Sequence, residues 1–460
     1  MKKRWIIMMA FLALFAVLGL VLPEGSSWEE EEGLNYANIA WMITATILVL
    51  MMTPGVAFFY GGMVRAKNVI STMLQSFIAI GVISVVWVVV GFSLAFGEDV
   101  GGLGIIGNPA TYFMFKDVGV HLPVGNENLG ALGLSIPLVL FALFQMKFAI
   151  ITPTLISGSF AERVHFSGYL VFMVLFCLFI YAPLAHGIWH PDGFLANKLH
   201  VADFAGGIVV HAASGIAALA GAIFLGRRHG AGKHRPANIA FVILGAAFLW
   251  LGWFGFNGGS SLAADGVAVK ACLNTNIACS VAMLVWVLFD CLQGRKPSAM
   301  GAAIGAVVGL VAITPSAGWV SVGQSLFIGF ITSLICNIAV HWKNKSTVDD
   351  VLDVFPTHGV GGIVGTILTG IFVYDAATSE VSHLVSILYH CLAVVLVFIY
   401  TFVGAYILYW VTSKMVPMRV SPENELEGLD RSQHDELYGL AMLTEEHELA
   451  EHHQPKTTDK

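Results

Sequence analysis

Charged residues are scarce in this sequence, and their scarcity excludes most soluble folds. Only 12% of the 460 residues are Asp, Glu, Lys or Arg, whereas 57% are apolar. Soluble domains carry about 25% charged residues, so an ordinary globular domain is not expected. The chain also lacks the basic excess typical of nucleic-acid-binding proteins, because its formal net charge is −7. Apolar runs recur almost from end to end, and they predict one polytopic, all-α membrane domain.

Cysteines are few and isolated, which removes another group of functions. No pair forms a Cys-x-x-Cys motif, and no His-Glu-x-x-His motif accompanies them. Neither a disulfide scaffold nor a zinc site is therefore indicated. Since no nucleophile–base pair stands out either, we expect no metal, no cofactor and no enzymatic activity. The cysteines are typical of small buried apolar residues; they are Cys177, Cys272, Cys279, Cys291, Cys336 and Cys391.

Eleven apolar segments are candidates for membrane-spanning helices, since a crossing takes about 20 residues. The sequence predicts spans at 36–60, 69–96, 133–159, 168–185, 203–225, 236–257, 271–291, 299–316, 319–341, 356–375 and 384–413. A further apolar run at residues 5–22 follows three basic residues and is typical of a signal peptide. We therefore divide the chain into a signal peptide at 1–27, a transmembrane domain at 28–416 and a polar tail at 417–460.

The distribution of Lys and Arg over the loops predicts the orientation of the chain. Loops after even-numbered spans carry only Lys116, Lys198 and Lys270. Because basic loops stay in the cytosol, we expect the loops after odd-numbered spans and the tail to be cytosolic. The mature N-terminus then lies outside the cytoplasmic membrane, which agrees with export by a signal peptide. Loops after odd-numbered spans carry Arg65, Lys67, Arg163, Arg227, Arg228, Lys233, Arg235, Arg295, Lys296, Lys343 and Lys345.

A short internal similarity links the two halves of the chain. The run His211-Ala-Ala-Ser-Gly-Ile216 in the fifth span resembles His358-Gly-Val-Gly-Gly-Ile363 in the tenth. The tenth span lies five positions after the fifth, so the two run in opposite directions through the membrane. This pattern predicts a five-plus-five inverted repeat, in which a substrate site lies near the midplane between the halves.

Four of the ionisable side chains inside predicted spans are candidates for function, because a charge there costs about 2.5–3.5 kcal/mol on insertion scales. Asp203 begins the fifth span and fits either a helix cap or a role linked to the substrate. His211 and His358, once brought together, can share a proton between their ring nitrogens, although each alone also fits a satisfied core residue. Lys147 lies in the third span, and we expect it off any conduction path, with its ammonium group directed to the interface or to a neighbouring subunit.

Aromatic residues near the outer ends of several spans are candidates for a cation site. A cation above an aromatic ring gains about 0.5–2 kcal/mol, and a nearby hydroxyl adds a hydrogen-bond acceptor. Each aromatic alone also fits core or interface packing. The candidates are Phe144 and Phe148 in the third span, Trp189 after the fourth, and Trp253, Phe256 and Ser260 at the end of the sixth.

Several motifs together resemble the ammonium transporter family of Amt, Mep and Rh proteins. They are Thr53-Pro-Gly-Val-Ala-Phe-Phe-Tyr-Gly-Gly62, Asp203-Phe-Ala-Gly-Gly-Ile-Val-Val-His211, Gly252-Trp-Phe-Gly-Phe-Asn-Gly-Gly-Ser260 and His358-Gly-Val-Gly-Gly-Ile-Val-Gly365. Ala161-Glu-Arg163 and Glu427-Gly-Leu-Asp430 fit the same family. The resemblance extends from about residue 36 to 440 and is closer to bacterial ammonium transporters than to Rh proteins.

The resemblance implies a homotrimer of eleven-helix subunits that takes up ammonium, with methylammonium as an analogue. It also implies a PII signalling protein at the cytosolic face, and each subunit would have its own pore. By motif match, Phe144, Trp189 and Ser260 form the external ammonium site with Trp253 at its entrance, Phe148 and Phe256 form the gate, His211 and His358 line the pore, and Asp203 supports the cation site.

Two other functions remain open at this point. The same scaffold suits an ammonium sensor that signals through its cytosolic tail and a PII protein. A general cation channel is the second alternative, and competition by potassium in a methylammonium uptake assay discriminates it.

Overall fold

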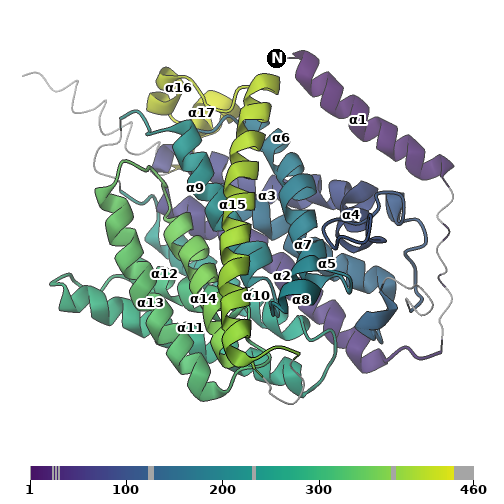
Figure 1. The fold of residues 1–460 in the computed structure, drawn as a ribbon. Coiled ribbons are helices and arrows are strands. Elements are labelled where there is room, and N and C mark those ends of the chain that lie inside the picture. The colour runs from purple at the N-terminus through teal and green to yellow at the C-terminus, as the bar shows by residue number, and fades with distance from the viewer. Residues whose placement is uncertain are drawn as a thin grey trace, which may run out of the picture.

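The computed structural model consists of helices joined by short loops. It describes residues 2–22, 25, 28, 32–122, 129–230, 235–374 and 380–439. Within these residues there is no β-sheet, and the two isolated bridges join Asp99 to Gly107 and Val164 to Arg419. The helices of the body pack side by side as one bundle (Figure 1), which confirms the predicted all-α class.

The elements follow one another along the chain as α-helices interrupted by short π-helical turns. The π-helical turns are η2 (Trp87–Gly91), η5 (Cys177–Tyr181), η6 (Gly207–Ala212) and η7 (Phe355–Gly359). The α-helices are α1 (Lys2–Val21), α2 (Tyr36–Met63), α3 (Val69–Val86), α4 (Phe92–Phe96), α5 (Leu138–Ile156), α6 (Phe166–Phe176), α7 (Ala182–Trp189), α8 (Phe194–Leu199), α9 (Ala213–Leu225), α10 (Ile239–Gly259), α11 (Gly266–Leu292), α12 (Ala299–Ile313), α13 (Val322–Lys345), α14 (Val360–Phe372), α15 (His383–Met415), α16 (Pro422–Glu427) and α17 (Leu429–His434).

Eleven helical segments of the described residues are long and apolar enough to cross a membrane. One of them is α1, and the other ten coincide with ten of the predicted spans. The remaining predicted span is α12, which has 15 residues and is therefore about 22 Å long. Most residues of α12 are buried among its neighbours, so this short helix lies mainly inside the bundle.

Helix α1 lies at the edge of the bundle (Figure 1). No residue of its apolar segment Arg4–Val21 is buried, although Met8 is partly buried against the core. A signal peptide at 1–27 stays a prediction, and several residues of that range lie outside those described.

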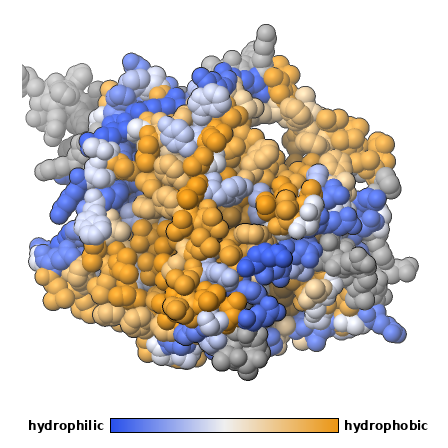
Figure 2. Space-filling view, in the orientation of Figure 1, coloured by the Kyte–Doolittle hydropathy of each residue, from blue (hydrophilic) through white to orange (hydrophobic). Residues whose placement is uncertain are grey.

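The surface of the bundle matches a lipid environment. Figure 2 shows apolar residues over the middle of the visible face and hydrophilic residues gathered toward two ends. Helix α15 contributes a long row of exposed large apolar side chains, Leu384, Leu388, Leu392, Val395, Leu396, Ile399 and Val403 among them. Water would oppose such exposure, whereas hydrocarbon favours it.

The polar tail docks against loops at one end of the bundle, which we call the tail side. Arg419 donates hydrogen bonds to the carbonyl of Leu225 at 2.6 Å and to Glu425 at 2.6 Å. Asp430 accepts hydrogen bonds from the backbone N–H groups of Ser71 at 2.8 Å and Ile70 at 3.1 Å. Those N–H groups belong to the first turn of α3, so the tail caps this helix.

Helices α9 and α14 run in opposite directions, as an inverted repeat requires. The last carbonyl of α9 faces the tail through Arg419, so α9 ends on the tail side. Asp349 precedes α14 and forms an ion pair with Arg228, which follows α9, at 2.9 Å. The segment that leads into α14 therefore starts on the side where α9 ends.

Candidate functional site

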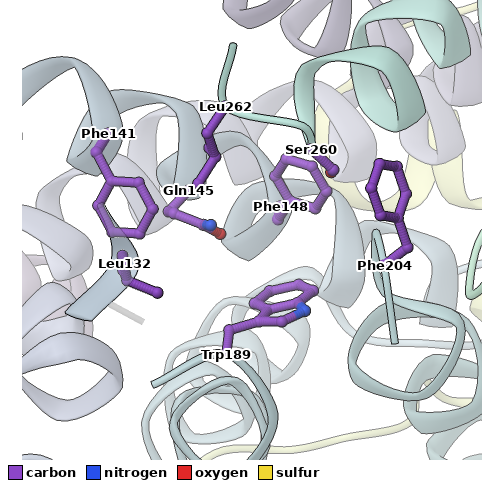
Figure 3. A pocket seen from close by; sticks show the side chains of 8 residues that line it. All are labelled: Leu132, Phe141, Gln145, Phe148, Trp189, Phe204, Ser260 and Leu262. Carbon is purple, nitrogen blue, oxygen red and sulfur yellow. The ribbon is translucent and has the colours of Figure 1, made fainter. Parts of the chain in front are cut away.

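An aromatic cavity of about 130 Å³ opens into the bundle on the side opposite the tail. Helix α6 begins on the tail side, because the N–H of Phe166 donates to Gln433 at 2.8 Å. The span that starts there ends at Trp189, which places Trp189 on the far side. Figure 3 shows the eight lining side chains, which are Leu132, Phe141, Gln145, Phe148, Trp189, Phe204, Ser260 and Leu262. Rings and hydroxyl thus meet here in one concave space.

Two phenyl rings pack together at one wall of the aromatic cavity. The centroids of Phe148 on α5 and Phe256 on α10 are 4.3 Å apart with planes inclined by 36°. Both side chains are buried. Trp189 meets Phe148 edge-on at 5.8 Å, and its Nε1 donates to the carbonyl of Asp203 at 3.0 Å. Phe148 thus lines the aromatic cavity, and Phe256 continues from it toward His211; a gate formed by the two rings stays a prediction.

A pair of histidines lies beneath the stacked phenyl rings. The Nδ1 atoms of His211 and His358 are 3.3 Å apart, and their ring centroids are 5.4 Å apart at 23°. His211 also lies 5.8 Å from Phe256 and is stacked on Trp253 at 5.2 Å. Both imidazoles line a narrow histidine cavity of about 10 Å³, whose other walls are mainly apolar.

The close approach of two backbones brings these histidines together. His211 lies in π-helical turn η6 and His358 in η7, turns that are frequent at functional sites. Where the two helices cross, a Cβ on Gly215 would lie 2.0 Å from the backbone nitrogen of Gly359. Because no other residue has so small a side chain, glycine at 215 permits the crossing that sets the imidazole spacing.

Asp203 is a helix-capping carboxylate. Its Oδ1 accepts hydrogen bonds from the N–H groups of Gly206 at 2.8 Å and Gly207 at 2.7 Å. Its Oδ2 accepts from Ile208 at 2.8 Å and Val209 at 3.3 Å. Both oxygens are therefore committed to the start of η6, four residues before His211. This geometry is the helix cap that was one of the two roles expected for Asp203. The other role, linked to the substrate, stays a hypothesis.

Three sequence-predicted residues lie away from the aromatic cavity. Trp253, expected at the external entrance, instead lines the histidine cavity and donates from Nε1 to Thr314 at 2.9 Å. Phe144 packs edge-on against Phe148 at 4.9 Å and is not among the lining side chains. Lys147 lines neither cavity; it is buried, and its Nζ lies 3.8 Å from the sulfur of Met146.

The sequence reasoning did not single out Gln145 or Phe204, which both line the aromatic cavity. Gln145 lies three residues before Phe148, a spacing that places two side chains on one helical face. Phe204 follows Asp203 and meets Trp319 edge-on at 5.0 Å. Periodicity signals were therefore available for Gln145, whereas the approach of Phe204 and Trp319 depends on tertiary packing.

An open cavity of about 400 Å³ lies next to the aromatic cavity and shares Trp189, Phe204 and Ser260 with it. Asp265 lines this space, caps α11 through the N–H of Ala268 at 2.8 Å and accepts from Ser261 at 2.6 Å. The carboxylate is exposed. It therefore adds a negative charge at the rim from which a solute reaches the aromatic cavity.

Ion pairs between loops organise the tail side. Burial raises the pKa of Glu162, but the charges and hydrogen bonds of Arg65 and Arg228 outweigh burial and lower it to about 2. Burial dominates at Asp430 and raises its pKa to about 6, against the hydrogen bonds from Ser71 and other backbone N–H groups. The same cause, with Asp353, raises the pKa of Asp350 to about 6. Glu162 is therefore charged at neutral pH and well below it.

No group of three or more His, Cys, Asp or Glu side chains in the described part of the chain has the geometry of a metal site. The arrangement instead provides rings, a hydroxyl and an amide on one side of a phenyl stack and two imidazoles on the other. Such a site suits a small cation that can also donate hydrogen bonds.

The sequence of this chain matches one family along most of its length. The model of the Ammonium Transporter Family matches residues 40–438. A protein of Methanothermobacter thermautotrophicus named putative ammonium transporter is 44% identical over 418 residues, which cover 88% of this chain and 98% of that protein. An ammonium transporter of Mycobacterium tuberculosis is 42% identical over 427 residues, which cover 87% of this chain and 89% of that protein.

Solved structures are similar to the whole bundle as well. Mep2 of Saccharomyces cerevisiae matches with a TM-score of 0.77 and 33% identity, covering 85% of this chain and 89% of that chain. A structure described as a sensor Amt protein matches with a TM-score of 0.77 and 30% identity, covering 87% of this chain and 98% of that chain.

Proposed function

This chain belongs to the ammonium transporter family and is a multi-pass membrane protein, and from that premise we propose that it takes up ammonium across the cytoplasmic membrane. In this proposal the aromatic cavity faces outward and binds the ammonium cation. The cation loses a proton near Asp203 and the phenyl gate, and this proton moves separately along the ring nitrogens of His211 and His358. Neutral ammonia passes the phenyl gate and the histidine cavity. The single observation that carries the proposal is the 3.3 Å approach of His211 and His358 between apolar walls.

Binding at the aromatic cavity rests on ring faces and one hydroxyl. A cation over Phe148 or Trp189 gains about 0.5–2 kcal/mol. Ser260 donates its hydroxyl hydrogen to the carbonyl of Phe256 at 2.8 Å, so its lone pairs are directed elsewhere and can accept an N–H of ammonium. Phe144 supports this site from behind by packing on Phe148.

Conduction of a neutral molecule explains selectivity against potassium. Potassium and ammonium have the same charge and similar size, so a charged group alone does not separate them. Moving a small ion into a medium of low dielectric constant costs of the order of 20 kcal/mol in the ideal limit, and a histidine cavity of about 10 Å³ is too small for a hydration shell. Ammonium has a neutral form that avoids this cost, and potassium has none.

The two imidazoles give ammonia its polar partners without a fixed charge. A hydrogen bond between two Nδ1 atoms contains one proton, so one ring has Nδ1–H and a bare Nε2 while the other has Nε2–H. The pore then offers one acceptor and one donor, and ammonia both donates and accepts. Asp203 fixes the start of η6 and thereby the position of His211; we assign it this supporting role near the cation site.

The loop charges supply the orientation in this proposal. The mature N-terminus lies outside, and the tail lies in the cytosol, where the basic side chain of Lys67 contacts the carbonyl of Leu426. The subunits form a homotrimer, and the docked tail offers a surface for a PII signalling protein. The alternative function is an ammonium sensor that acts through the same tail, and the likeness to a sensor Amt protein favours keeping it.

Currents from proteoliposomes under an ammonium gradient test the proposal, with potassium as the control ion. The variant His211→Leu with His358→Leu removes both polar partners, and we expect ammonium transport to fall at least about tenfold with the fold intact. His200→Gln is the matched control, because His200 is a half-buried histidine that lines neither cavity. Unchanged transport and unchanged preference for ammonium over potassium in the double variant would refute the role of the pair.

A further inference from the structure

His186, near the end of α7, has an oxygen acceptor beside each of its two ring nitrogens. Its Nδ1 lies 3.0 Å from the carbonyl oxygen of Ala95, and its Nε2 lies 3.1 Å from Oδ1 of Asp99. The imidazole is fully buried, and the side chain of Asp99 is 6% exposed. Neither side chain lines the aromatic cavity or the histidine cavity. This cluster therefore has no part in the function proposed above.

The hydrogen bonds of the His186 ring require a second proton. A neutral imidazole has one N–H donor and one bare nitrogen. A backbone carbonyl and a carboxylate only accept, so either neutral tautomer would direct a lone pair of the ring at an oxygen about 3 Å away. A ring with a proton on each nitrogen donates to both oxygens. The geometry therefore fits an imidazolium, and Asp99 supplies the opposite charge.

The surroundings of His186 also favour a positive charge. The residue lies in the last turn of α7, where the helix dipole stabilises a cation. His190 is stacked on the ring, with centroids 4.2 Å apart. His190 itself stays neutral, because its Nδ1 accepts the N–H of Asp192 at 3.1 Å and because burial and the charge of His186 lower its pKa to about 4. The described carboxylates near the His186 ring are Asp99 and Asp192, and Asp192 is 60% exposed.

The carboxylate of Asp99 joins the loop at 97–107 to the end of α7. Its Oδ1 also accepts the N–H of Gly104 at 2.8 Å, and a backbone bridge pairs Asp99 with Gly107. The carbonyl of Gly104 in turn accepts the N–H of Phe194 at 2.8 Å. A Cβ on Gly104 would lie 2.2 Å from the carbonyl oxygen of Asp192, so this loop lies directly against the segment that follows α7.

Trp189 connects this cluster to the aromatic cavity. It lines that cavity, it is the last residue of α7, and it follows His186 by three residues. The N–H of His190 donates to the carbonyl of His186 at 3.2 Å, so one helical turn holds all three residues. A shift of the His186 backbone therefore reaches the indole ring directly.

We propose that a buried proton on His186, paired with Asp99, fastens the 97–107 loop to the last turn of α7 and thereby positions Trp189. His186 is a positioning residue in this proposal, since it acts on the cavity through Trp189. The fastened form contains a proton that a neutral imidazole beside a free carboxylate lacks, so raising the pH favours the released form. The inference does not depend on which solute enters the aromatic cavity.

Melting temperatures of the purified full-length protein test the coupling to pH. Between about pH 5 and about pH 9, the wild type should lose at least about 3 °C more than Asp99→Asn, because asparagine offers the imidazolium no opposite charge. Glu380→Gln is the matched control, since Glu380 is an exposed carboxylate 3.9 Å from a ring nitrogen of His200; it should follow the wild type. Equal pH profiles for the wild type and Asp99→Asn would overturn the inference.

Nitrogen-15 NMR of histidine-labelled protein reads the ring itself. The wild-type signal that disappears in His186→Gln, or in His186→Asn where the first variant does not fold, should show two protonated nitrogens at about pH 6. A bare nitrogen in that ring would refute the buried proton.

Fluorine NMR of protein labelled with fluorotryptophan follows the positioning of Trp189, whose signal is the one lost in Trp189→Phe. This signal should shift between about pH 5 and about pH 9 in the wild type and stay fixed in Asp99→Asn. An indole signal that does not move while His186 loses its proton would contradict the positioning role. None of these measurements uses ammonium transport, so a failure of the proposed function does not affect them.

Discussion

The glycine at position 215 offers a direct test of how the pore is built. A Cβ at this position would lie 2.0 Å from the backbone nitrogen of Gly359 and 2.3 Å from its Cα. Ordinary contact begins at 3.4 Å, so Gly215→Ala must separate the two backbones by at least about 1.4 Å. The Nδ1 atoms of His211 and His358, now 3.3 Å apart, then move beyond hydrogen-bond distance.

We expect Gly215→Ala to lower ammonium transport at least about tenfold although both histidines remain. Two further glycines grade the perturbation: a Cβ on Gly361 would meet a side-chain carbon of Val311 at 3.1 Å, and a Cβ on Gly81 would meet nothing within 4 Å. Transport rates in proteoliposomes should therefore be highest for Gly81→Ala, lower for Gly361→Ala and lowest for Gly215→Ala. Thermal stability is measured for each variant. A folded Gly215→Ala protein with the wild-type rate would show that the close crossing does not set the pore, and the reasoning would fail.

Three further predictions concern charges outside the pore. Asp265→Asn keeps the helix cap but removes the rim carboxylate, so uptake at low ammonium should fall about two- to threefold in dilute buffer. The difference should vanish at 0.5 M salt, where screening is strong. Glu98→Gln changes another exposed carboxylate and should show no such loss. Lys147→Met should leave uptake within about twofold, since Lys147 lines neither cavity; faster uptake would place its charge on the path. The pKa of Asp430 is about 6 when the tail is docked and 3.8 ordinarily, so docking is coupled to proton uptake and should tighten as pH falls from 7 to 5. Trypsin cleavage of the tail should slow over that range in the wild type. A flat profile shared with Asp430→Asn would contradict the assignment.

The sequence alone predicted the helical class and the spans because their signals are local. Length and apolar content decide whether a segment can cross a membrane, and the structure confirms helices at all eleven predicted spans, α12 being short. Polarity in the wrong place marked His211 and His358, which the structure brings within hydrogen-bond distance. The family is confirmed as well.

Depth within a helix was harder to predict than face. Trp253 precedes Phe256 by three residues, so both share a face of α10. Trp253 lies about 4.5 Å nearer the start of the helix. That rise carries it past the phenyl stack and into the histidine cavity. An unpaired amide oxygen such as that of Gln145 is also invisible in sequence, because satisfaction depends on neighbours from other helices. The π-helical turns η6 and η7 have no signature in the residue pattern either.

In the proposed mechanism, the one proton that the two imidazoles share determines which proton transfer the pair can carry out next. A proton that enters at the bare Nε2 of one ring and leaves from the Nε2–H of the other shifts the shared proton across the Nδ1–Nδ1 bond. Afterwards both rings present the reverse pattern, and a second proton travelling the same way meets a hydrogen where it needs a lone pair. A second proton can follow only after both imidazoles have returned to their starting tautomers. Any charge that crosses by this route therefore moves one proton at a time, with a tautomer change between transfers.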